Sequence, residues 1–144
     1  MNTSITGEPA APEHVGVALR AITAGVFVGT GITATALYFA RGLQAREPAP
    51  AVPVTTGLVP NLILTGWLGG AALAALCAWV LMAPINSSYR RGAFAMVAAF
   101  AALVLALVTM PADALFGRTG LLAISVVGLA GGLLLARRAR KRLE

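Results

Sequence analysis

The chain has 144 residues, of which 58% are hydrophobic and only 11% are charged, and its formal net charge is +6. Average soluble domains carry roughly 25% charged residues. This composition therefore excludes a water-soluble globular domain, whose surface would need more charge, and it favours a membrane protein.

The first predicted span follows a short polar segment. Residues 1–11 lack apolar periodicity, and we expect a disordered N-terminal tail there. We predict a transmembrane domain over residues 12–136, with its first helix beginning near Pro12 and its first span at about residues 15–40. Within that span, Ala21–Ala40 has no charged residue. Its threonine hydroxyls are expected to bond back to the preceding turn.

A proline-rich segment separates the first span from the second. Arg41–Asn61 is rich in proline, and we predict an extended linker there. The second span, at about residues 62–83, has no charged side chain and ends before Pro84. A helix of about 20 apolar residues crosses a hydrocarbon core of about 30 Å. Because this stretch is apolar on every side, it is predicted to be a membrane span.

Two further spans follow, at about residues 92–110 and 119–136. The short connection between them carries Asp113 and Arg118, which are the opposite charges expected to pair there. Residues 137–144 are predicted to form a basic cytoplasmic tail directly after the last span. The predicted fold is thus all-α, an integral membrane protein with four transmembrane helices in a compact bundle.

The distribution of basic residues predicts the orientation. Four spans place both termini on one side, and basic residues collect on the cytoplasmic side of membranes. The terminal side holds most of them, and these are the predicted lipid-headgroup and topology residues: Arg20, Arg90, Arg91, Arg137, Arg138, Arg140, Lys141 and Arg142. The opposite side holds Arg41, Arg46 and Arg118.

We therefore expect a multi-pass protein with both termini in the cytoplasm and with anionic lipid as a partner of the basic residues. The abundance of arginine, alanine and glycine is typical of a GC-rich bacterial genome, which indicates a bacterial cytoplasmic (inner) membrane.

Few residues of the chain could carry catalytic or metal chemistry. The charge-free cores contain no Asp, Glu, Lys, Arg or His, the groups on which proton- or cation-coupled transport depends. The chain has one cysteine, Cys77, and one histidine, His14, so no disulfide, haem or zinc site can be assembled from them. We predict that the protein is not an enzyme and that it binds no cofactor and no metal. We also predict no nucleic-acid partner, because nothing beside the basic tail indicates such binding.

Small residues recur at four-residue steps in three of the spans. Such ridges let helix backbones approach closely, which drives helix association in lipid. The predicted helix-packing residues are Gly25, Gly29, Gly66, Gly70, Ala74, Ala78, Gly128 and Gly132.

Two functions agree with these patterns. The first is a non-catalytic accessory or structural subunit of a larger bacterial membrane complex, such as an energy-transducing one, that binds through apolar helix faces. Its partners would be other membrane subunits or further copies of the chain. The alternative is a small oligomeric channel or carrier with a path lined by threonine and glycine. The lack of charge within the spans favours the first function.

Overall fold

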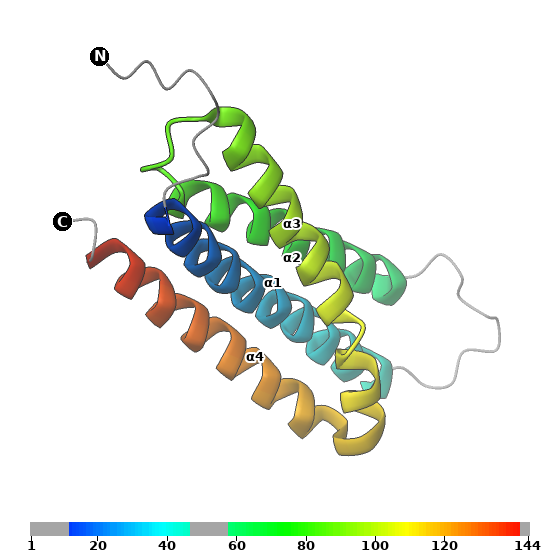
Figure 1. The fold of residues 1–144 in the computed structure, drawn as a ribbon. Coiled ribbons are helices and arrows are strands. Elements are labelled where there is room, and N and C mark those ends of the chain that lie inside the picture. The colour runs from blue at the N-terminus through cyan, green and yellow to red at the C-terminus, as the bar shows by residue number, and fades with distance from the viewer. Residues whose placement is uncertain (1–11, 47–57, 142–144) are drawn as a thin grey trace, which may run out of the picture.

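The computed structural model describes residues 12–46 and 58–141, and its ordered elements are all helices (Figure 1). They are α1 (Pro12–Arg46), α2 (Leu58–Leu81), α3 (Ser88–Ala106) and α4 (Thr109–Lys141). Each helix is long and apolar enough to cross a membrane, which suggests a multi-pass membrane protein. The predicted all-α class with four candidate spans is confirmed. The predicted disordered tail at residues 1–11 lies outside the described residues.

α1 is the central helix of the structure. It contacts α2, α3 and α4, whereas α4 packs almost entirely on α1 and barely touches α2 or α3. α2 and α3 also pack on each other. The start of α1, the end of α4 and the α2–α3 connection lie at one end of the molecule, and the α3–α4 turn lies at the other (Figure 1). We call these the terminal end and the distal end.

Two helices extend into the segment expected to be a linker. α1 continues to Arg46 instead of ending before Arg41, because the residues that follow Arg41 include good helix formers and no proline before residue 48. α2 begins at Leu58 and includes Pro60 in its first turn. Proline is tolerated there because the first amides of a helix have no intrahelical acceptor.

The boundary between α3 and α4 also differs from the expected one. α3 ends at Ala106, and α4 begins at Thr109, whose hydroxyl donates to the Ala106 carbonyl at 2.5 Å. α4 is interrupted at Gly117, whose φ of 64° and ψ of −154° are non-helical. Glycine adopts a positive φ without the steric cost of a Cβ atom. Beyond Gly117, α4 continues as helix to Lys141, so the first basic residues of the predicted tail are helical.

A side chain of α2 hydrogen-bonds a backbone carbonyl near the end of α3, and a side chain of α3 does the same near the end of α2. In a regular α-helix the Leu107 amide would donate to the Leu103 carbonyl, but here it donates to the Val104 carbonyl. The Trp67 indole Nε1 donates to the Leu103 carbonyl in its place, at 3.2 Å. At the terminal end, Arg91 Nη2 donates to the Trp79 carbonyl at 2.9 Å, and its guanidinium lies 4.6 Å from the Trp79 ring centroid. Helix ends leave carbonyls without amide partners, so these contacts fix α3 against α2 at both ends.

Charged side chains join α1 to α4 at the distal end. Arg41 Nη2 and Nε lie 2.6 Å and 2.8 Å from Oδ2 of Asp113, whose side chain is only 10% exposed. The guanidinium of Arg118 stacks 4.5 Å from the ring centroid of Tyr38. The predicted pairing of Asp113 with Arg118 is therefore wrong. α1 extends far enough to bring Arg41 to the carboxylate, and Arg118, one residue beyond the break at Gly117, stacks on Tyr38 instead.

We expect Asp113→Asn to lower the free energy of unfolding by roughly 1.5 kcal/mol, because a hydrogen bond to a charged group contributes about that much. Unfolding of the purified protein in detergent measures the loss. The double-mutant cycle with Arg41→Gln should give a coupling free energy of at least about 0.5 kcal/mol. Strictly additive effects would contradict the pairing.

Candidate functional site

The predicted small residues of α1 and α2 form the closest helix contact. A Cβ atom on Gly25 would lie 2.5 Å from the carbonyl oxygen of Ala74. A Cβ atom on Gly29 would lie 2.6 Å from the carbonyl oxygen of Gly70, and one on Gly70 would lie 2.6 Å from that of Gly29. The two backbones therefore touch directly, and no side chain larger than hydrogen fits at these positions without a shift.

The remaining predicted residues of α2 lie along the same contact. A Cβ atom on Gly66 would collide with the Cβ atom of Ala36. Ala78 is fully buried in an apolar cluster at the terminal end, together with Ala21 and Met82. The structure thus brings Gly66, Gly70, Ala74 and Ala78 together with α1, as small-residue ridges require.

α4 packs on a different face of α1. A Cβ atom on Gly128 would lie 2.8 Å from the Cα atom of Gly31, and one on Gly132 would lie 3.1 Å from the Val28 amide nitrogen. Gly31 is a packing residue that sequence reasoning missed. Gly31 lies two positions after Gly29 and therefore on another face of the helix. It is four positions before Thr35, and this four-residue spacing was the sequence signal that could have revealed a second packing face.

The hydroxyls of α1 bond mainly within the protein. Thr23 and Thr35 donate to the carbonyls four residues earlier, and Thr35 also bonds Ser125 of α4. Thr33 is shared between the Gly29 carbonyl at 3.1 Å and the Gly66 carbonyl of α2 at 3.3 Å. These bonds satisfy groups that are costly to leave unpaired in an apolar environment.

Thr30 is the exception among these threonines. Its Oγ1 is buried and has no hydrogen-bond partner within the described part of the chain. It lines an apolar groove of about 430 Å³ between α1, α3 and α4, with Phe27, Leu105 and Val127 among the lining residues. One hydroxyl on an otherwise apolar wall does not make a polar path.

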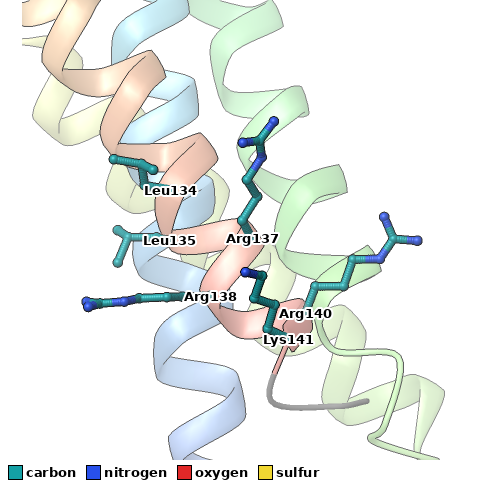
Figure 2. Close-up of a pocket in the computed structure, with 6 residues that line it drawn as sticks. All are labelled: Leu134, Leu135, Arg137, Arg138, Arg140 and Lys141. Carbon is teal, nitrogen blue, oxygen red and sulfur yellow. The ribbon is translucent and has the colours of Figure 1, made fainter.

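The predicted headgroup residues gather at the terminal end. Arg20 and Arg90 are exposed, whereas Arg91 is half-buried against Trp79 and stabilises the end of α2. Arg142 lies outside the described residues. Figure 2 shows the last turns of α4, where a hollow of about 790 Å³ is lined by two leucines and four cations: Leu134, Leu135, Arg137, Arg138, Arg140 and Lys141.

Neither a metal centre in the described residues nor a known relative indicates the function. Within residues 12–46 and 58–141, no group of three His, Cys, Asp or Glu side chains is placed to hold a metal ion. Comparison of the chain with protein-family models, curated proteins and solved structures finds no match. The features of the molecule that bear on function are therefore its helix-packing contacts and the outer surface of its helices.

Adjacent glycines of α2 provide a matched test of the packing. Gly70→Ala should destabilise the protein, because overpacking costs typically about 1–3 kcal/mol and exceeds the gain in helix propensity of about 1 kcal/mol. Gly69→Ala gains the same propensity and has nothing within 4 Å of the added Cβ atom. Thermal unfolding in detergent should show a lower midpoint for the first variant only. Equal midpoints would show that the glycine contact is not a stabilising one.

Proposed function

We propose that this protein is a non-catalytic accessory subunit of a larger bacterial membrane complex. In this proposal its four helices span the cytoplasmic membrane as a compact bundle, with both termini in the cytoplasm. It binds neighbouring subunits through the apolar outer faces of its helices. The observation that carries the proposal is the contrast between the interior and the outer surface. Helix backbones in direct contact and hydroxyls bonded within the protein fill the interior. Most of the outer helix surface is not covered by other parts of the chain.

The interior supports binding over transport. Gly29 and Gly70 bring the α1 and α2 backbones into contact, and Thr33 bridges the same two helices. A path lined by threonine and glycine, the alternative function, needs hydroxyls that face an open passage. Here Thr33 and Thr35 are bonded to carbonyls instead. Without an ionisable group in the charge-free cores, the chain also lacks the usual means of coupling flux to protons or cations.

The outer surface supports a partner on α3. In each of α2, α3 and α4, only 22% of the most apolar stretch is buried within the chain. On α3, Met96 and Phe100 are each 69% exposed, and Val97 and Val104 are exposed on the same side. Aromatic residues and methionine are enriched at protein interfaces, and methionine adapts to irregular partner surfaces. We therefore assign this α3 face as the subunit-binding surface.

The positions of the charges support the orientation. Arg20, Arg90 and the last turns of α4 lie at the terminal end, whereas Arg41, Asp113 and Arg118 lie at the distal end. The greater number of exposed cations at the terminal end favours a cytoplasmic location for that end. Each of the two ends would then lie at one membrane surface.

The subunit interaction is tested by recovery of partners with the tagged protein in mild detergent. We expect stoichiometric recovery of larger membrane subunits, and Met96→Ala combined with Phe100→Ala should reduce it about tenfold, because buried aromatic anchors carry much of the affinity at interfaces. Leu64→Ala combined with Leu68→Ala removes two exposed apolar side chains from α2, which are 52% and 54% exposed, and is the matched control.

Two results would contradict the proposed subunit role. The first is recovery of the protein alone at unchanged membrane abundance. The second is proton-gradient-driven uptake by the purified protein in liposomes, which a transporter would show and an accessory subunit would not.

The orientation is tested with single cysteines in a Cys77→Ser background. Ala114 and Asn86 are exposed. Ala114 follows Asp113 at the distal end, and Asn86 belongs to the α2–α3 connection at the terminal end. In spheroplasts, a membrane-impermeant maleimide should label Ala114→Cys, and it should label Asn86→Cys only after lysis. The Cys77→Ser protein itself should remain unlabelled. Equal or reversed labelling would contradict the proposed orientation.

A further inference from the structure

The space between α2 and α4 is a groove that opens to the outside. It exists because α2 and α4 pack on different faces of α1 and barely contact each other. The groove encloses about 830 Å³ and is lined by Val28 of α1, by Leu76 and Val80 of α2, and by Leu133 of α4. Its wall is therefore mainly aliphatic along most of its length.

The length of the groove along α2 matches the thickness of the hydrocarbon layer of one bilayer leaflet. Its lining on α2 runs from Leu73 to Ala83, just beyond the end of the helix. At 1.5 Å rise per residue, this distance is about 15 Å, and the hydrocarbon core of a bilayer is about 30 Å thick. The groove thus reaches from near the bilayer centre to the surface at the terminal end.

Two cations line the groove at that surface. Arg137 and Arg140 are three residues apart and so share one side of α4. Figure 2 shows both side chains extending toward α2, whereas Arg138 extends to the opposite side of α4. Among the described side chains, Asp113 is the only carboxylate, and it pairs with Arg41 at the distal end. No carboxylate among the described side chains therefore pairs with these two arginines, and their positive charge would attract an anion.

We propose that the α2–α4 groove binds one anionic phospholipid of the cytoplasmic leaflet. An acyl chain lies along Leu76, Val80 and Leu133, and the phosphate is held by Arg137 and Arg140. Guanidinium groups bind phosphate through paired, charge-assisted hydrogen bonds. A helix seated in the groove would instead have to supply its own carboxylate at this level, since burying the arginines unpaired is costly. The inference rests on the proposed membrane insertion and orientation, not on the proposed partner subunits.

The test is native mass spectrometry of the full-length protein in mild detergent with added phosphatidylglycerol or phosphatidylcholine. We expect one preferred phosphatidylglycerol per chain. Arg137→Gln combined with Arg140→Gln should weaken its binding at least about tenfold. Arg138→Gln combined with Lys141→Gln removes the same charge from residues that line the hollow but not the groove, and it should weaken binding less than about threefold. Ala136→Phe should also weaken binding, because it fills the groove without changing the charge.

Several outcomes would overturn the inference. Equal losses in the two double variants would mean that lipid responds only to diffuse charge at the terminal end. Undiminished binding by Ala136→Phe, or equally tight binding of glycerol 3-phosphate, would show that no acyl chain occupies the groove. A dimer that Ala136→Phe dissociates would place a second copy there. Failure of the protein to float with vesicles would contradict the proposed membrane insertion, which is distinct from loss of lipid selectivity in a protein that does float.

Discussion

The direct contact between the backbones of α1 and α2 is the constraint on which the rest of the structure depends. Gly29 and Gly70 each lie where an added Cβ atom would be 2.6 Å from the carbonyl oxygen of the other. In a membrane-inserted protein, as proposed above for this chain, no hydrophobic effect drives helices together, so association would depend on close van der Waals packing and on hydrogen bonds between helices. Thr33 adds such a bond at the same place. Larger residues here would separate α1 from α2.

Polar contacts complement this packing by fixing the helices at their ends. Arg91 and Trp67 satisfy the carbonyls of α2 and α3, and Arg41 binds the carboxylate of Asp113 across α1 and α4. Small residues set how closely two helices approach, but they specify rotation and register less strongly. Directional bonds at both ends restrict sliding. The mid-helix contacts and the end contacts thus have separate roles in the arrangement around α1.

Much of the helical structure and most of the tight contacts could be predicted from the sequence. The apolar stretches indicated four helices, and the four-residue spacing of Gly25 and Gly29 indicated a close contact. Gly31 was missed because one helix can carry two packing faces, and a single ridge does not show this. The Arg41–Asp113 pair was missed because it depends on α1 extending beyond its apolar part. Local pattern shows where a helix is apolar, whereas tertiary contacts determine where it ends.

The central position of α1 has a consequence for how the chain is made. Domains synthesised on the ribosome emerge with the N-terminal part first, and α1 is the first of the four described helices as well as the one that the other three all contact. Each of the three later helices therefore finds a helix to pack on already made: α2 and α4 pack chiefly on α1, and α3 packs on both α2 and α1. α4 is made after the other three helices and packs on the face of α1 that carries Gly31. Assembly can follow the order of synthesis, because no helix after α1 has to wait for a partner that has not yet been made.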